Sequence, residues 1–216
     1  GKDGLAGYPL IDVYLTGKEL KLAAEVDASV SDFMTTARLY CSGLNFTFNP
    51  HRMILNKVTD CYLTREDGER IEIQDDQLYR VVTDLYTGQM LGSVMEMSYG
   101  LLKIEPKDKD GNPIENLEDQ AIMEGDKELK AWDAIARYMK SFDDTDGNGI
   151  SNVPEYYETT HGRKVVDESR NVIDLVKNPN KFSVMIVGIV LVLILIIILL
   201  VVLIRKLIKK RRRKKK

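Results

Sequence analysis

The stretch YPLIDVYLTGKEL, residues 8–20, changes from the period of a strand to that of a helix within a few residues. Ile11, Val13 and Leu15 alternate with less apolar neighbours, as in a strand with one buried face. Gly17 breaks this alternation, and residues 18–26 consist almost entirely of helix formers. We therefore expect a strand over residues 10–16 that leads directly into a helix.

The rest of the N-terminal part repeats both patterns. Alternating or β-branched runs between turn residues predict further strands at 40–48, 58–63, 70–73, 79–84 and 99–104. A short helix is expected at 88–97, and a clearer one at 128–142. In the second helix one apolar stripe contains Leu129, Trp132, Ile135, Ala136, Met139 and Phe142. This mixture predicts the α+β class, with a mixed sheet and flanking helices.

Residues 184–204 are the most hydrophobic run of the chain. These 21 residues contain no charge, no proline and a single glycine. At about 1.5 Å per residue they extend roughly 31 Å, which matches a hydrocarbon core of about 30 Å. The alternative, a buried helix of a soluble core, rarely exceeds about 18 apolar residues. We therefore predict a single transmembrane helix.

The flanks of this helix predict its orientation. Ten of the twelve residues in 205–216 are Lys or Arg, whereas residues 178–181 contain one cation. Cytoplasmic flanks carry such a basic excess, so we expect a cytoplasmic tail and an extracellular N-terminal domain at the cell membrane. Composition alone also permits a nuclear-localisation or nucleic-acid role for the tail. Its place directly after the span favours a stop-transfer signal that contacts anionic membrane lipid.

The charge of the remainder is acidic. Residues 1–183 hold all 33 acidic side chains and 21 basic ones, a formal charge of about −12, which argues against nucleic-acid binding. The chain starts with Gly1 and has no n-region or apolar h-region of a signal peptide. Since an outward-facing domain must be exported, we expect a signal peptide upstream and a longer protein of which this chain is the C-terminal portion.

The two cysteines fall in runs that we expect to pair. If residues 39–49 and 53–63 form a hairpin that turns at residues 50–52, partners have numbers that add up to 102, which places Cys41 opposite Cys61. A disulfide between Cys41 and Cys61 is then sterically allowed in an exported domain. The alternative is a pair of buried free thiols.

Composition divides the chain into five parts. We expect a strand-rich domain over 1–106, a helix with an acidic loop over 107–162, and a polar stalk over 163–183. The transmembrane helix over 184–204 and the basic tail over 205–216 follow.

Three stretches in order resemble one known domain. They are YPLIDVYLTGKEL at 8–20, CSGLNF at 41–46 and YRVVTD at 79–84. Together they resemble the C-terminal domain of the bacterial 5'-nucleotidase and 2',3'-cyclic phosphodiesterase family over about residues 5–105. The resemblance implies a surface-bound hydrolase that acts in nucleotide catabolism.

The same resemblance places catalysis outside this sequence. In that family an N-terminal metallophosphatase domain holds two divalent metal ions, which activate water for attack on phosphorus. We expect that domain upstream or in a separate chain, and we expect no catalytic residue here. His51 and His161 lie far apart in the sequence without metal-ligand neighbours, which indicates a turn and a loop position.

The resemblance also implies nucleoside binding, in which two aromatic rings enclose the base. Tyr40 and Tyr99 are the candidate rings. Arg38 stands where the family often has an aromatic residue, and the family's Gly-Gly-Asp-Gly-Phe loop is replaced by MSYGL at 97–101. For Tyr99 the alternative is a packed core position. For the whole domain the alternative is a non-enzymatic surface module that keeps the scaffold without the nucleotide site.

An acidic loop, DTDGNGISNVPE at residues 144–155, has the ligand spacing of an EF-hand. The predicted Ca²⁺ ligands are the side chains of Asp144, Asp146, Asn148 and Glu155 and the carbonyl of Ile150. Ser151 and Pro154 depart from the usual pattern, and one unpaired loop is expected to bind with a Kd on the order of 10⁻⁴ M or weaker. The alternative is a solvated turn after the preceding helix.

Overall fold

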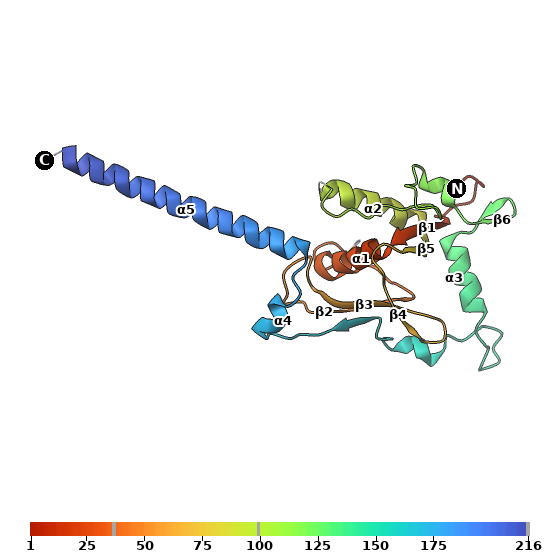
Figure 1. Ribbon diagram of the computed structural model, residues 1–216. Coiled ribbons are helices and arrows are strands. Elements are labelled where there is room, and N and C mark those ends of the chain that lie inside the picture. Colours follow the sequence, from red (N-terminus) through yellow and green to blue (C-terminus); the bar gives the residue numbers. More distant parts are fainter. Residues whose placement is uncertain (36–37, 99, 215–216) are drawn as a thin grey trace.

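The strand and helix expected at the N-terminus are present as β1 (Leu10–Thr16) and α1 (Gly17–Val30). They belong to a computed structural model that describes residues 1–35, 38–98 and 100–214 (Figure 1). Thr16 caps the helix, because its hydroxyl accepts a hydrogen bond from the Glu19 N–H and the Glu19 carboxylate accepts one from the Thr16 N–H. A Cβ atom on Gly17 would lie 2.1 Å from the carbonyl oxygen of Gln74, so this helix start requires glycine.

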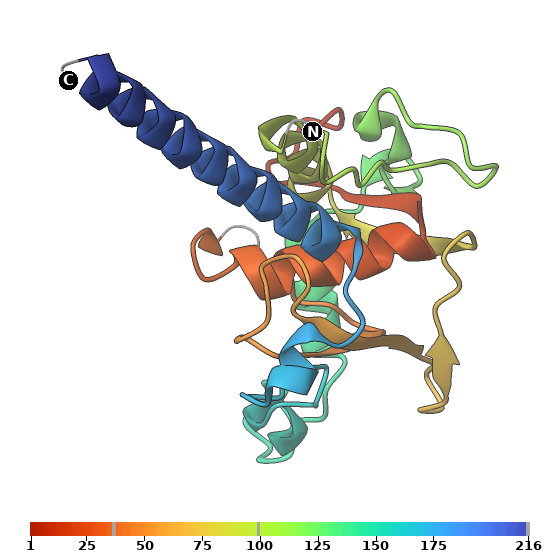
Figure 2. The ribbon, with the colours of Figure 1, turned by 60° about the vertical axis from the view of Figure 1, so that its left-hand side comes forward.

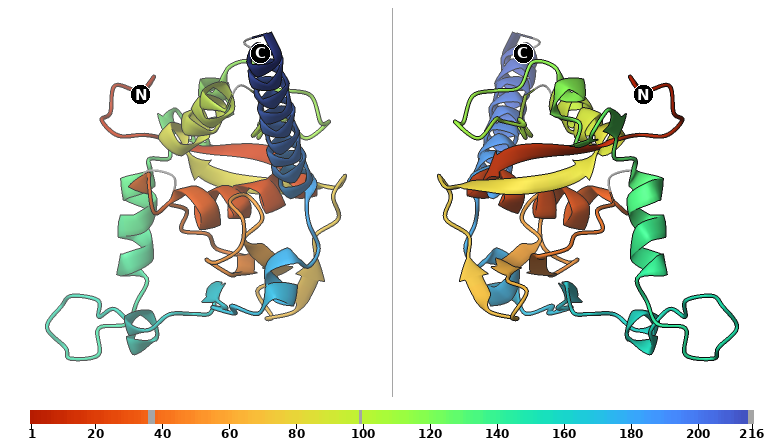
Figure 3. Two further views of the ribbon diagram at one scale, coloured as in Figure 1. Left: turned by 90° about the vertical axis from the view of Figure 1, so that its left-hand side faces the viewer. Right: turned by 90° about the vertical axis from the view of Figure 1, so that its right-hand side faces the viewer.

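Two sheets enclose α1 (Figure 3). β1 pairs antiparallel with β5 (Leu78–Asp84) as a two-stranded ribbon. The second sheet has the order β4-β3-β2-β8, formed by Arg70–Glu72, Val58–Thr64, Leu44–Phe48 and Lys164–Val166. Its last strand, β8, runs parallel to β2, so the sheet is mixed as predicted.

The core lies on both sides of α1. Leu20 and Ala23 pack against Leu15 of the ribbon and against Ile104. Ala24 and Ala28, on another side of the helix, pack against Phe46 of the second sheet. Small side chains on that side let the helix backbone approach the sheet closely, which explains the run of alanines in α1.

The remaining elements surround this core. α2 (Leu85–Met97) begins three residues earlier than predicted, because Asp84 accepts hydrogen bonds from the N–H and hydroxyl of Thr87. β6 (Met123–Glu124) and β7 (Lys127–Glu128) form a small hairpin, and α3 (Ala131–Lys140) starts only after it. Two 3₁₀ turns, Leu117–Gln120 and Glu155–Glu158, lie in the same part of the chain.

One strand prediction and one register prediction are wrong. Residues 100–104 form turns and irregular backbone; Tyr99 lies outside the residues that the structure describes. The alternation there reflects burial instead, since Ile104 packs against Leu15 and Leu102 packs against Val26. The hairpin register also differs: Phe46 pairs with Cys61, so partners add up to 107.

The longer connection between β2 and β3 explains that shift. Residues 49–57 form a compact loop in which the Asn49 N–H donates to the Lys57 carbonyl and the Arg52 N–H donates to the Asn49 carbonyl. The predicted turn at 50–52 would have placed residues 53–57 in the second strand. Because these residues belong to the loop, the partners in the two strands shift.

Segment 163–183 is packed on the domain and is not a free stalk. Residues 164–166 form β8, and the buried guanidinium of Arg52 donates hydrogen bonds to the carbonyls of Asp174 and Lys177, both at 2.6 Å. Asp174 is the middle residue of the short helix α4 (Val172–Val176), and Lys177 follows its last residue. Polar groups of this segment form hydrogen bonds to the domain. A polar composition alone does not show whether such groups bind the domain or water.

The last helix, α5 (Lys181–Lys214), leaves the domain and extends away from it (Figures 1 and 2). Phe182 and Ser183 in its first turn are buried, and Phe182 packs against Val26 and Leu102. The stretch Lys181–Lys210 is long and apolar enough to cross a membrane, and in its most apolar window no residue is buried by the rest of the molecule. The fold is therefore α+β with one long apolar C-terminal helix.

Candidate functional site

A cavity of about 930 Å³ lies where α1, β3, residues 100–107 and residues 178–182 meet. Its walls are rich in charge of both signs. The basic lining residues are Lys18, Lys21, Lys103, Lys107 and Lys181, and the acidic ones are Glu19, Glu25, Asp60, Asp75, Asp76 and Glu105. A cavity of this size and polarity suits a small charged or strongly polar ligand.

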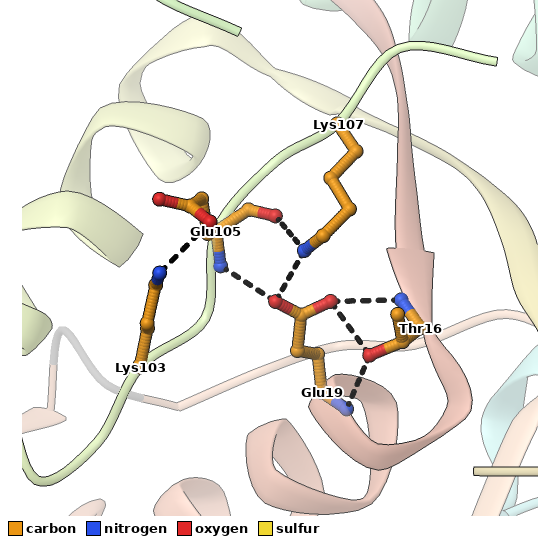
Figure 4. Close-up of polar contacts among 5 residues, drawn as sticks. All are labelled: Thr16, Glu19, Lys103, Glu105 and Lys107. Carbon is orange, nitrogen blue, oxygen red and sulfur yellow. Dashed lines mark hydrogen bonds and ion pairs between the residues drawn. The ribbon is translucent and has the colours of Figure 1, made fainter. Parts of the chain in front are cut away.

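Glu19 is the most highly connected carboxylate of the cavity wall (Figure 4). One carboxylate oxygen accepts from the Thr16 N–H and hydroxyl at 2.8 and 2.7 Å. The other accepts from the Glu105 N–H at 3.1 Å and from the Lys107 ammonium at 2.6 Å. Lys107 also donates to the Glu105 carbonyl at 2.7 Å, so this cluster joins the start of α1 to residues 105–107.

The environment of Glu19 keeps its carboxylate charged. Burial would raise the pKa of Glu19, but hydrogen bonds from Lys107, Thr16 and Glu105 outweigh burial and hold the pKa below its ordinary value. A carboxylate with all these donors is a poor proton acceptor. Glu19 therefore positions the cavity wall and has no free capacity for acid–base chemistry.

The pKa of Glu25 is shifted in the opposite direction from that of Glu19. Its two carboxylate oxygens accept from the backbone N–H groups of Lys57 and Val58 at 3.0 and 2.8 Å. Burial raises the pKa of Glu25 and outweighs these hydrogen bonds, which by themselves lower it. Two carboxylates on one helix, both lining one cavity, thus have pKa values shifted in opposite directions.

Cys41 and Cys61 are both free thiols in the structure, and the disulfide is not formed. The register that placed Cys41 opposite Cys61 is wrong, since Cys61 faces Phe46 across the sheet and Cys41 precedes β2. Burial raises the pKa of both thiols, that of Cys61 to about 12. Cys61 lines the cavity but stays protonated at neutral pH, so it is not a nucleophile.

Most charges of the cavity are already paired. Lys21 contacts Asp75 at 2.7 Å, Lys103 contacts Glu105 at 3.0 Å, and Asp60 contacts Arg70 at 2.8 Å. Among residues 1–35, 38–98 and 100–214, no group of three or more His, Cys, Asp or Glu side chains is placed to hold a metal ion.

Tyr40 is the predicted nucleoside residue that the structure describes, and it lies away from this cavity. Tyr40 does not line it, and 89% of the residue is exposed. The ammonium of Lys164 lies 5.5 Å from the centre of the Tyr40 ring. Tyr99 is outside the described part of the chain, so its position relative to Tyr40 stays a prediction.

The acidic loop brings part of its predicted ligand set together. The carboxylate of Asp144 accepts from the N–H groups of Gly147 and Gly149 at 2.8 Å each. The Asn148 N–H lies 3.2 Å from carboxylate oxygens of both Asp144 and Asp146. Loop positions 1, 3 and 5 are thus adjacent, while Ile150 is exposed and Glu155 begins a 3₁₀ turn.

The two histidines have separate surroundings. The His161 ring stacks on Tyr156 with centroids 3.8 Å apart, and the His51 Nε2 accepts from the Arg170 Nε at 3.3 Å.

Sequence reasoning missed the Glu19 cluster. The pattern Thr16-x-x-Glu19 at the start of a helix is a capping-box signal and would have indicated half of that cluster.

The N-terminal part of the chain matches the model of a known family. Residues 6–98 match the family model of the 5'-nucleotidase, C-terminal domain. This part of the chain is therefore a 5'-nucleotidase C-terminal domain, as its three motifs suggested.

Two solved structures are similar to the chain. The 5'-nucleotidase precursor from Thermus thermophilus is 18% identical with a TM-score of 0.45, over 76% of this chain and 26% of that one. The NAD nucleotidase of Haemophilus influenzae is 19% identical with a TM-score of 0.34, over 47% of this chain and 19% of that one. The chain thus spans about a quarter of the first relative and a fifth of the second. Comparison with curated proteins found no match.

Proposed function

We propose that this chain is the nucleotide-recognition and membrane-anchoring part of a cell-surface 5'-nucleotidase-type phosphohydrolase of nucleotide catabolism. The observation that carries the proposal is a 5'-nucleotidase C-terminal domain joined through a buried first turn to the apolar helix α5. The domain would bind the nucleoside part of the substrate, and α5 would hold it at the membrane with the domain outside and the tail in the cytoplasm.

Hydrolysis itself is assigned to a metallophosphatase domain, upstream or in a separate chain. Two divalent metals there would activate the attacking water. No residue of the present chain is assigned a catalytic role. The chain would contribute substrate affinity and location.

Tyr40 is the side chain of this chain proposed to stack on the base. Because 89% of Tyr40 is exposed, its ring is free to contact a planar ligand without displacing other protein groups. Base stacking is worth about 1–3 kcal/mol per ring. Lys164 beside this ring would favour a negatively charged neighbour of the base, although the ammonium also pairs with Asp27 at 2.8 Å. Tyr99 is proposed as the second ring.

Calorimetric titration of the purified full chain with adenosine tests this assignment. We expect a Kd tighter than about 1 mM, weakened about 5- to 150-fold by Tyr40→Ala, which corresponds to the loss of one stacking contact. Tyr40→Phe keeps the ring and should keep the affinity. Tyr86→Ala, at an exposed tyrosine of α2, is the matched control. Absence of adenosine binding by the wild-type chain would refute nucleoside recognition.

A second candidate function is a calcium-binding, membrane-tethered surface module without enzymatic partners. The adjacency of the Asp144 and Asp146 carboxylates at the Asn148 N–H favours it. Titration of the full chain with Ca²⁺ should then release or absorb heat at millimolar concentrations.

The loop at Asp108 offers a matched control for this titration. Asp108 also accepts backbone N–H bonds, from Asp110 and Asn112 at 2.9 Å. Asp108, Asp110 and Asn112 repeat the spacing of loop positions 1, 3 and 5, but Pro113 stands at position 6, where the EF-hand requires glycine. Asp144→Ala should abolish the calcium signal, whereas Asp108→Ala should leave it unchanged. An unchanged signal in Asp144→Ala would exclude the loop as the binding site.

A further inference from the structure

The short helix α4 has its apolar side turned outward. Val172, Ile173 and Val176 are 71%, 69% and 65% exposed, and their spacing places them on one side of the helix. Asp174 and Leu175 between them are half-buried against the domain. This distribution is the reverse of a surface helix in water, where an acidic side chain would face the solvent.

Hydrogen bonds hold α4 in this orientation. The Asn171 side chain caps the helix by accepting from the Ile173 N–H at 3.0 Å. The Ser169 hydroxyl donates to the Asp174 carboxylate at 2.6 Å, and buried Arg52 donates to the Asp174 and Lys177 carbonyls. Because Arg52 binds the domain to the middle of α4 and to the residue that follows it, the three aliphatic side chains cannot turn inward without breaking these contacts.

α4 lies beside the point where α5 leaves the domain. In the left-hand view of Figure 3, α5 projects toward the viewer and α4 lies below its base, at the same end of the domain. The base is fixed as well, since the Asn180 side chain donates to the Leu55 carbonyl and accepts from the N–H groups of Phe182 and Ser183 at 3.1 Å. Lys177, which follows α4, and Lys181, the first residue of α5, are both exposed.

We propose that the outward side of α4 inserts into the interfacial layer of the bilayer leaflet next to the domain. Val172, Ile173 and Val176 would contact acyl chains, and Lys177 and Lys181 would contact lipid phosphates. The inference rests on the proposed anchoring by α5. Two attachments, α4 and α5, would then set the orientation of the domain on the membrane, with the cavity near the lipid surface because Lys181 and Phe182 also line it.

Fluorescence of the full chain in liposomes tests the proposal. The chain has one tryptophan, Trp132, on α3, which lies at the end of the domain away from α5 (Figure 1). In a Trp132→Phe background, Ile173→Trp places the only tryptophan on the outward side of α4. Lipids with bromine atoms near the top of the acyl chains should quench this tryptophan strongly and leave Trp132 of the wild-type chain unquenched.

Position 173 tolerates the larger ring because it is exposed, and Val176→Trp in the same background should report the same quenching. Resistance of the chain to alkaline extraction from the liposomes tests the anchoring by α5 separately from the insertion of α4. An extracted chain would overturn both the anchoring and this inference. An integrated chain whose α4 tryptophans escape bromolipid overturns this inference alone. Access of aqueous iodide to those tryptophans would then show α4 in water, and exclusion of iodide would show it covered by protein, such as a second copy.

Discussion

The ammonium of Lys107 lies 2.6 Å from the carboxylate of Glu19, and both side chains are largely withdrawn from water. The contact joins α1 to the segment after Ile104, two parts of the chain separated by 88 positions. It closes one wall of the cavity described above. Its energetic role can be measured through its dependence on pH.

Glu19→Gln should destabilise the domain by about 3 kcal/mol at neutral pH, because it leaves the buried Lys107 ammonium without its counter-charge. The pKa of Glu19 is lower in the folded state than in the unfolded chain. The stability that it contributes is therefore present above the unfolded pKa and is lost as the pH falls through the folded pKa. Denaturant unfolding at several pH values should show this acid loss in the wild type and a weaker loss in the variant. Glu66→Gln, at an exposed position, is the control.

Glu25→Gln should show the opposite pH dependence. The pKa of Glu25 is raised in the folded state, so its contribution is fully present below the unfolded pKa and is lost as the pH rises through the folded pKa. The amide can accept only one of the two backbone N–H bonds from Lys57 and Val58, which should cost about 1–3 kcal/mol in acid. The difference from wild type should shrink toward neutral pH. A difference that grows with pH would contradict the assigned burial.

Arg52→Met should release the segment that contains α4. The buried guanidinium donates to the carbonyls of Asn56, Asp174 and Lys177, all at 2.6 Å. Hydrogen bonds from a charged donor contribute about 1.5–3 kcal/mol each. Hydrogen exchange of the full chain should show faster exchange at residues 172–177, with α1 unchanged. Equal protection in variant and wild type would mean that other contacts hold α4.

Cys61 should react slowly with maleimide in the folded chain. Its pKa of about 12 leaves almost no thiolate at neutral pH. Labelling should accelerate strongly in denaturant, where the thiol returns to its ordinary pKa and full exposure. Mass spectrometry of the labelled peptides distinguishes Cys61 from Cys41, and labelling of folded Cys61 at the rate of a free thiol would refute the burial.

The orientation of the chain can be tested in cells that express it behind a signal peptide. An epitope tag placed before Gly1 should be digested by protease added to intact cells, and one placed after Lys216 should be protected. The reverse pattern would overturn the proposed topology. Equal protection of both tags would show that the domain is not exported.

The helices and strands that could be predicted from the sequence are determined by interactions between residues close together in the chain. The alternation in residues 10–16, the helix formers after Gly17 and the apolar run of α5 act within one element, so each is visible in a short window of sequence. Half of the Glu19 cluster belongs here as well, since Thr16 and Glu19 are three residues apart. The family motifs at 8–20, 41–46 and 79–84 also lie in or beside such local elements.

The tertiary structure alone decided the register of Phe46 against Cys61, the addition of residues 164–166 as a strand, and the outward apolar side of α4. It also decided the cavity, where Lys107 and Phe182 come to lie around α1. Each of these depends on contacts between positions far apart in the chain, such as Arg52 with Lys177. Their free energy comes from burial and hydrogen bonds that exist only after the chain has closed, and no local period in the sequence encodes them.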